Sequence, residues 1–297
     1  MDTMRYALFL GCTVPIRNMN YELSARKVAE RLGIELVDSD QFSCCGYPTK
    51  SLDHHAALVM AARNLTVAEE MGLDICVLCS ACGGTLTEAA KMLNEDAAMR
   101  DRVNADLEAA TGKRYGGTVR VWHIARILYE VVGLDRLRRE VKVSLQGFRF
   151  AAHYGCHYLK PSESYEGFDD TEVPHTLDDL IAVTGAEAVN HNTKLDCCGG
   201  GVLAVDEEVA LSMPAAKLTE LKALGADAIV LICPFCDVMY EYNQRRIEKG
   251  ANARFGLPVL FYPQVLGLAL GIPAEELGFG LNRVKSRELS QKLAALA

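Results

Sequence analysis

The sequence lacks an apolar run long enough to cross a bilayer. The longest such run, VLFYPQVLGLALGI at 259–272, is shorter than the ~20 residues that a transmembrane helix needs, and it contains Pro263 and Gln264. No positively charged segment followed by a long apolar stretch opens the chain, as a secretory leader would. We therefore expect a cytoplasmic protein. With 297 residues, half of them hydrophobic, the chain can bury one large core or two modest ones.

The sequence also lacks an excess of positive charge and a nucleotide fingerprint. The 31 Lys and Arg residues are outnumbered by 39 Asp and Glu residues, which gives a net charge of -8. Nucleic-acid binding normally needs a basic face, so this balance argues against it. No Gly-x-Gly-x-x-Gly stretch is present to predict a flavin or dinucleotide site. Electrons for any redox chemistry would therefore come from another protein chain.

Cysteine, in contrast, is abundant, and ten of the eleven cysteines belong to an internal repeat. RYALFLGC (5–12) aligns with RFAAHYGC (149–156), CCG at 44–46 with CCG at 197–199, and GLDICVLCSAC (72–82) with GADAIVLICPFC (225–236). Each copy has one cysteine, then 31 or 40 residues, then Cys-Cys, then 33 or 34 residues, then Cys-x-x-Cys. In a reducing compartment, so dense a set indicates metal or redox chemistry rather than disulfides. The repeat predicts two related domains, residues 1–145 and 146–297.

The local patterns in both halves predict an α/β fold. RYALFLG, RFAAHYG, LDICVL and DAIVLI are typical of short buried parallel strands, and helices are expected over 21–33, over 53–72 and from the segment that follows Cys82. Gly33 and Gly72 would end the first two helices. Strands that alternate with helices favour a Rossmann-like sheet in each half. The cysteines then lie on loops at the sheet edge where such folds bind ligands.

Five thiols in each half exceed the needs of the simplest metal sites. Structural zinc uses four ligands, usually two Cys-x-x-Cys pairs, and each half has only one such pair. CVLCSAC (76–82) spells the start of a ferredoxin cubane motif, but no fourth cysteine and proline follow it. Adjacent thiols such as Cys44 and Cys45 more naturally reach two metal atoms than one. A multi-iron cluster with a bridging ligand or an open form is favoured, while a zinc scaffold and an ordinary ferredoxin site stay as alternatives. Cys76, outside the repeat, is expected to be a buried core thiol.

The doubled pattern, from Arg5 to about Gly271, resembles the cysteine-rich CCG family and specifically the B subunits of heterodisulfide reductases. The resemblance implies two CCG domains in a pseudo-twofold arrangement, with a noncubane [4Fe-4S] cluster in each. The clusters would face one another across the domain interface, and a disulfide between them would be reductively cleaved or formed. The implied ligands of the first cluster are Cys12, Cys44, Cys45, Cys79 and Cys82, and those of the second are Cys156, Cys197, Cys198, Cys233 and Cys236.

Reduction of a disulfide yields thiolates, so proton donors are expected near the cysteines. His153, His157 and Lys160 flank Cys156 and are the candidates for this catalytic role. His54 and His55 are expected on the solvated surface, and His123 in local packing.

The resemblance also implies partners in a larger complex. These are a ferredoxin-like iron–sulfur subunit and a flavin-containing subunit, of the types that heterodisulfide reductases contain, together with a disulfide or thiol substrate. The alternative is a CCG electron-transfer subunit of another membrane-associated or soluble oxidoreductase, such as one that oxidises lactate, glycolate or glycerol phosphate.

Overall fold

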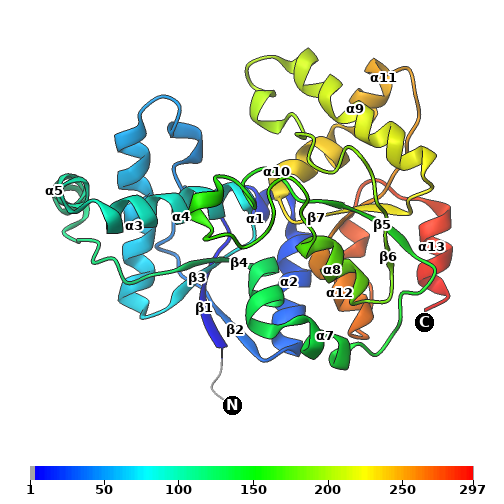
Figure 1. Cartoon of the computed structure of the whole chain (residues 1–297), viewed down its shortest axis with the longest axis horizontal. Helices are drawn as coiled ribbons and strands as arrows, with labels where there is room; N and C mark the ends of the chain where they lie inside the picture. Colours follow the sequence, from blue (N-terminus) through cyan, green and yellow to red (C-terminus); the bar gives the residue numbers. More distant parts are fainter. Residues whose placement is uncertain (1–3, 297) are drawn as a thin grey trace.

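Two four-stranded parallel sheets, one in each half of the sequence, form the framework of the molecule (Figure 1). The computed structural model describes residues 4–296. The strand order is β2-β1-β3-β4 in the first sheet and β6-β5-β7-β8 in the second. The strands of the first sheet are β1 (Met4–Phe9), β2 (Ile34–Val37), β3 (Asp74–Val77) and β4 (Val121–His123). Those of the second are β5 (Arg149–His153), β6 (Glu187–Ala188), β7 (Ala228–Leu231) and β8 (Val259–Phe261). The predicted fold class, two tandem related α/β domains, is confirmed.

Helices connect the strands in both halves. The first half contains α1 (Val14–Arg17), α2 (Met19–Arg31), the 3-10 helix η1 (Tyr47–Thr49), α3 (His54–Met71), α4 (Ser80–Glu95), α5 (Ala97–Thr111), α6 (Ile124–Arg126), the π-helix η2 (Ile127–Val132) and α7 (Leu134–Glu140). The second contains η3 (Ser162–Ser164), α8 (Thr176–Ala182), η4 (Gly200–Val202), α9 (Glu207–Ala223), α10 (Pro234–Asp237), the π-helix η5 (Val238–Tyr242), α11 (Gln244–Gly250), α12 (Tyr262–Ala269), η6 (Phe279–Leu281) and α13 (Arg287–Ala294). Within residues 4–296, none of these helices combines the length and the apolar character that crossing a membrane requires.

The central strand of each sheet carries the predicted apolar run. β1 lies between β2 and β3, and β5 lies between β6 and β7. In both sheets the second strand in the sequence pairs on one side of the first strand, and the third strand pairs on its other side. The direction in which strands are added to the sheet therefore reverses at the first strand. In open parallel sheets, ligands bind at this reversal, outside the carboxyl ends of the strands. Cys12 and Cys79 follow β1 and β3 at that edge, and Cys156 and Cys233 follow β5 and β7.

Equivalent helices follow the Cys-Cys-Gly segments. α3 and α9 each begin after an aspartate, Asp53 or Asp206, whose carboxylate accepts a hydrogen bond from a backbone N–H of the first turn. The predicted helix over 53–72 is confirmed, and Gly72 ends it in the left-handed conformation. The helix predicted over 21–33 begins earlier, at Met19, and ends at Arg31.

The helix expected after Cys82 was predicted to start too late. α4 begins at Ser80, with Cys79 at its N-cap, so Cys82 is already in the first turn. Cysteine has no strong preference for the N-cap, and glycine has a low helix propensity, so the local pattern does not mark Ser80 as the first residue of the helix.

The two halves pack on each other through α2 and α12, which lie side by side in the middle of the molecule (Figure 1). The ring of Tyr21 on α2 stacks on that of Phe261, with centroids 4.1 Å apart. Asn18 donates a 2.6 Å hydrogen bond to the buried carboxylate of Asp237. The carbonyl of Ile232, the residue before Cys233, accepts a hydrogen bond from Tyr21 and another from His123. Side chains of the first half thus fix the position of a cysteine loop of the second. The domain boundary between residues 145 and 146 stays a prediction.

Candidate metal centre

The Cys-x-x-Cys pair occupies the same place in both halves. Cys79 and Cys233 are the N-cap residues of α4 and α10, and Cys82 and Cys236 are the third residues of these helices. Unpaired backbone N–H groups at a helix start stabilise nearby negative charge and so favour the thiolate, the form of cysteine that binds metals.

The thiols of the two halves form one continuous set of contacts. In the first half Cys44 contacts Cys45, Cys45 contacts Cys82, and Cys82 contacts Cys79. In the second half the corresponding series runs through Cys156, Cys197, Cys198, Cys236 and Cys233. Cys79 and Cys233 are neighbours across the interface, where Ser80 donates a 3.5 Å hydrogen bond to the carbonyl of Ile232, and they join the two series. Cys12 lies beside this set. A Cβ atom added to its neighbour Gly11 would lie 3.0 Å from the sulfur of Cys82, so the backbone next to Cys12 runs close to that thiol. All eleven cysteines have free thiols.

The exposure of the thiols also repeats. The single cysteines, Cys12 and Cys156, are exposed, and the first member of each adjacent pair is half-buried. The other three cysteines of each half are buried. A cavity of about 270 Å³ opens beside Cys12 and Cys44 at the carboxyl edge of the first sheet. A small molecule can therefore approach the single cysteines while the Cys-x-x-Cys pairs stay inaccessible.

The glycine of each Cys-Cys-Gly segment is required by the backbone. Gly46 and Gly199 have φ values of +95° and +81°, a conformation that side chains other than glycine rarely adopt. A Cβ would also lie 2.7 Å from the carbonyl oxygen of Ala57 at Gly46, and 2.3 Å from that of Ala210 at Gly199. The turn lets the Gly199 N–H donate to the sulfur of Cys197 at 3.4 Å. The glycine thus allows the loop to lie against the helix and to turn N–H groups toward the thiols.

Neighbouring thiols favour negative charge at particular cysteines. The thiol of Cys82 and two backbone N–H groups lower the pKa of Cys45 to about 7, against the opposing effect of burial. The thiol of Cys156, followed by that of Cys198, lowers the pKa of Cys197 to about 2. Cys82, the neighbour of Cys45, and Cys156, the neighbour of Cys197, have raised pKa values and so keep their protons. Each half therefore offers at least one thiolate that can take up a metal near neutral pH.

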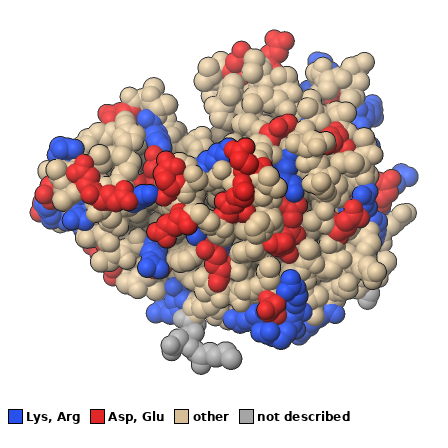
Figure 2. Space-filling model, in the orientation of Figure 1, with Lys and Arg blue, Asp and Glu red and all other residues tan. Residues whose placement is uncertain are grey.

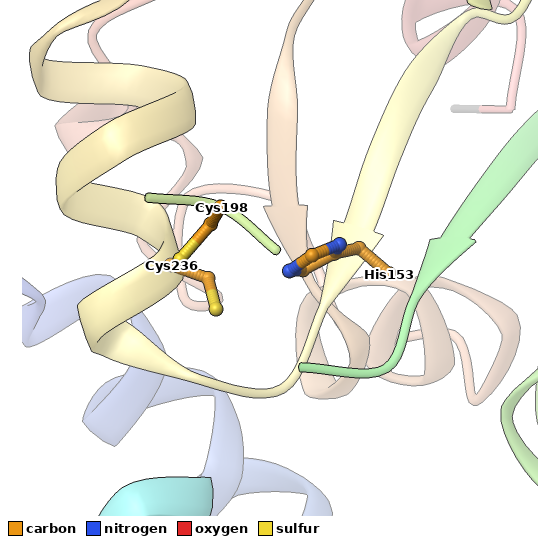
Figure 3. Close-up of side chains that lie close together, drawn as sticks. All are labelled: His153, Cys198 and Cys236. Carbon is orange, nitrogen blue, oxygen red and sulfur yellow. The ribbon is translucent and has the colours of Figure 1, made fainter. Parts of the chain in front are cut away.

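The arrangement does not match one preformed zinc site. Within residues 4–296, the one group of three or more ligand atoms that all lie within 4.8 Å of one another consists of His153, Cys198 and Cys236 (Figure 3). A tetrahedral zinc ion with Zn–S bonds of about 2.3 Å would require four ligands clustered this closely. Ten thiols in an extended series instead fit groups that contain several metal atoms. The donor set is thus suited to iron–sulfur clusters, for which cysteine thiolates are the usual ligands.

The three predicted proton donors lie at different depths. His153, at the end of β5, is buried, and Figure 3 shows its ring pointing toward the sulfurs of Cys198 and Cys236. His157 is half-buried, and its ring meets the edge of Tyr47 from the first half. Burial lowers the pKa of His157. Lys160 is exposed. The catalytic role of these three residues stays a prediction.

His54, His55 and Cys76 lie where the sequence indicated, while His123 takes part in the contact between the two halves. His54 and His55 are exposed, and His55 pairs with Asp106 at 2.6 Å. His123 is buried at the interface, where its Nδ1 accepts a hydrogen bond from the N–H of Ala125. Cys76 is wholly buried on β3, and burial alone raises its pKa far above the ordinary value.

Sequence reasoning missed two residues next to the thiols. Lys217 on α9 is wholly buried, and its ammonium group lies 2.8 Å from Nδ1 of His153. The sequence did carry a signal for it, because Lys217 falls on the apolar stripe of α9 that includes Ala210, Pro214 and Leu221. Tyr47, just after Cys-Cys-Gly of the first half, reaches across to Phe235 of the second. No sequence pattern indicated this contact, because it depends on how the halves are placed.

Comparisons with known proteins agree with this description. The family description of the cysteine-rich domain CCG matches the chain twice, over residues 6–87 and 150–241. The B subunit of the ferredoxin/F420H2-dependent CoB-CoM heterodisulfide reductase of Methanosarcina acetivorans is 36% identical over 97% of both chains. A protein of Archaeoglobus profundus, named as similar to the B subunit of heterodisulfide reductase, is 36% identical over 92% of this chain and 93% of its own. The chain belongs to the CCG family of cysteine-rich proteins, in the branch of the heterodisulfide reductase B subunits.

Two further similarities extend this picture. The 8-methylmenaquinol:fumarate reductase membrane anchor subunit of Wolinella succinogenes is 33% identical over 96% of this chain and 98% of its own. The crystal structure of a hypothetical protein from Helicobacter pylori superposes with a TM-score of 0.77 at 17% identity. That match covers 97% of this chain and 53% of the other, and it supports the fold alone. The Methanosarcina acetivorans and Wolinella succinogenes relatives are both named as subunits of reductases.

Proposed function

We propose that this chain is the catalytic iron–sulfur subunit of a heterodisulfide reductase-like complex. In this proposal Cys12, Cys44, Cys45, Cys79 and Cys82 hold one noncubane [4Fe-4S] cluster, and Cys156, Cys197, Cys198, Cys233 and Cys236 hold the other. The observation that carries the proposal is that the two Cys-x-x-Cys pairs meet at one interface, where Ser80, next to Cys79, donates a 3.5 Å hydrogen bond to the carbonyl of Ile232, next to Cys233. Two redox groups held there can act on the same substrate.

A disulfide is the substrate class that suits two clusters, each of which transfers one electron. Cleavage of a disulfide consumes two electrons and two protons and releases two thiols, and formation of the disulfide is the reverse. The two clusters would supply one electron each. The exposed residues Cys12 and Cys156, one in each half, mark the places where the two sulfurs of a substrate can approach. The cavity beside Cys12 and Cys44 provides room on the side of the first half.

The side chains around the second set would handle the protons. His153 lies beside Cys198 and Cys236, His157 is half-buried near Cys156, and Lys160 is exposed at the surface. His153 can hold a proton at Nε2 next to the sulfurs, while His157 and Lys160 connect the site to solvent. We propose these three residues as the groups that protonate the product thiolates.

The electrons are proposed to come from other chains of the complex. The proposed partners are a ferredoxin-like iron–sulfur subunit and a flavin-containing subunit, of the types that heterodisulfide reductases contain. The name of the Methanosarcina acetivorans relative, which mentions ferredoxin and F420H2, supports an external electron source for proteins of this kind.

Single replacements of one cysteine in each half test the proposal. Cys45→Ala and Cys198→Ala should each abolish reduction of a model disulfide by a reduced viologen dye, while electron paramagnetic resonance still detects the cluster of the unaltered half. Cys76→Ala, a buried cysteine outside the repeat, is the matched control and should keep turnover and iron content. Near-normal turnover in either Cys45→Ala or Cys198→Ala would contradict action of both sets on one disulfide.

A second function is favoured by one of the relatives. The Wolinella succinogenes protein spans nearly the same length but is named as part of a fumarate reductase. The alternative proposal is therefore that this chain transfers electrons within another oxidoreductase and leaves the substrate chemistry to a partner. Near-normal turnover in one of the two cysteine variants would favour this alternative.

A further inference from the structure

The two thiol sets differ in the residues that lie behind them. The aligned segments RYALFLGC and RFAAHYGC place Phe9 of the first half opposite His153 of the second. The aligned helices α3 and α9 place Asn64 opposite Lys217, because Asp53 and Asp206 cap their first turns and each helix is followed by a glycine in the left-handed conformation. The first half thus has the phenyl ring of Phe9 where the second has the imidazole of His153. It has the neutral amide of Asn64 where the second has the ammonium group of Lys217.

Lys217 is placed as a buried cation. Its side chain is 0% exposed, and Nζ has three acceptors, which are the carbonyl oxygens of Lys194 and Asp196 at 3.2 and 3.1 Å and Nδ1 of His153 at 2.8 Å. An ammonium group has three N–H donors, so each finds one partner. The ring of Tyr240 lies 5.7 Å from Nζ and also favours the charged form, while burial lowers the pKa of Lys217 to about 8.

The contact with Lys217 determines which nitrogen of His153 carries hydrogen. Nδ1 accepts from the ammonium group, so the neutral ring has its proton on Nε2. Nε2 is buried and has no hydrogen-bond partner in the protein. A nitrogen of the His153 ring lies within 4.8 Å of the sulfurs of Cys198 and Cys236. Figure 3 shows that the ring nitrogen farther from the backbone faces these sulfurs. A buried donor without a partner destabilises the folded chain, so this N–H group is positioned for an acceptor held by those cysteines.

The equivalent residues of the first half serve a different purpose. Asn64 donates to the carbonyl of Cys44 and accepts from the N–H of Ser43, so it fixes the backbone of the loop and brings no charge. Phe9 is wholly buried and packs edge-on against Phe42. At these two positions the first thiol set therefore has neither a donor like the N–H group of His153 nor a cation like Lys217.

We propose that Lys217 and His153 make the two redox groups unequal, with the higher reduction potential at the C-terminal set, and that Lys217 acts as a positioning residue through its contact with His153. This inference rests on the proposed function, because it presupposes a cluster in each half. Hydrogen bonds to cluster sulfurs and nearby positive charge stabilise the reduced, more negative state and raise its potential. The C-terminal set then accepts an electron before the N-terminal set does.

A redox titration of the intact holoprotein, followed by electron paramagnetic resonance, tests the inference. The wild type should show two midpoint potentials. In Lys217→Met and in His153→Phe, which copies the first-half residue, the higher midpoint should move downward while the lower one stays in place. Lys217→Arg keeps the positive charge and should retain the higher midpoint. Lys222→Met removes a lysine from the same helix that bonds to the carbonyl of Phe255, away from the thiols, and serves as the control.

Iron and sulfide analysis of every sample separates the possible failures. If the wild type contains no clusters, the proposed function is wrong and this inference falls with it. If the wild type and both variants contain the full complement but neither midpoint moves, the inference alone is wrong. Loss of iron in His153→Phe would make His153 a metal ligand through Nε2, and would also overturn the assignment of that nitrogen as a donor.

Discussion

The glycine of each Cys-Cys-Gly segment offers a perturbation whose effect can be worked out from the structure. In Gly46→Ala and Gly199→Ala the new side chain must adopt the left-handed conformation, at a cost of about 1–2 kcal/mol. The Cβ would also lie 2.7 or 2.3 Å from a backbone carbonyl oxygen of the following helix. Moving a helix away from such a contact costs about 1–3 kcal/mol. The lower entropy of the unfolded chain offsets about 0.4–1 kcal/mol of this.

These terms predict a loss of about 2–4 kcal/mol in the free energy of unfolding for each variant. The loss should be larger for Gly199→Ala, because its contact is closer. Gly33→Ala is the matched control, since Gly33 has a φ of +72° but no atom within 4 Å of the added Cβ. It should lose only about 1 kcal/mol, which is the backbone cost less the entropy offset.

Urea denaturation of the anaerobically purified proteins measures these differences, and iron analysis adds an independent readout. Each Cys-Cys-Gly variant should lose the iron of its own half, because the loop that carries two thiols has to move. Gly33→Ala should keep all of its iron. If Gly46→Ala and Gly199→Ala are no less stable than Gly33→Ala, the steric account of the motif is refuted.

Two further predictions concern residues away from the metal. Cys76→Val should keep the full iron content and disulfide turnover, because Cys76 is a wholly buried strand residue that contacts no other thiol of the set; loss of about half the iron would show that it is a ligand. Asn18→Ala should lower the free energy of unfolding by about 1–3 kcal/mol, because it leaves the buried carboxylate of Asp237 without its donor; an unchanged urea midpoint would contradict the role of this contact at the interface.

The sequence was sufficient for the parts of the fold that local pattern determines. Apolar runs that end in glycine or cysteine predicted β1, β3, β5 and β7, and the internal repeat predicted that two similar sheets would form. The helix that begins at Ser80 was misplaced, because its N-cap is Cys79 and its first turn continues into two glycines. Local propensity carries little information at such a position.

The parts of the site that depend on tertiary packing could not be predicted. Contact between Cys79 and Cys233 requires the orientation of one half on the other, which is set by α2, α12 and hydrogen bonds to the carbonyl of Ile232. His153 was identified from its position beside Cys156, but its contact with Lys217 joins residues 64 positions apart. The position of Lys217 on the apolar face of α9 indicated from the sequence that this lysine is buried. Its contact with His153 is evident only in the folded chain.

Figure 2 shows how charged side chains are distributed over one face of the molecule. Acidic and basic side chains are interspersed over the face seen in Figure 2, and no large basic area covers that face. This distribution is in line with the net charge of -8. The same view shows a notch between the two upper lobes, which belong to different halves of the chain (Figures 1 and 2).

Metal and sulfide analysis of protein purified without oxygen tests the central claim most directly. Two noncubane [4Fe-4S] clusters predict a brown protein with about eight irons per chain, acid-labile sulfide and negligible zinc. About four irons would mean that only one of the two thiol sets holds a cluster. One stoichiometric zinc ion without acid-labile sulfide would contradict the account.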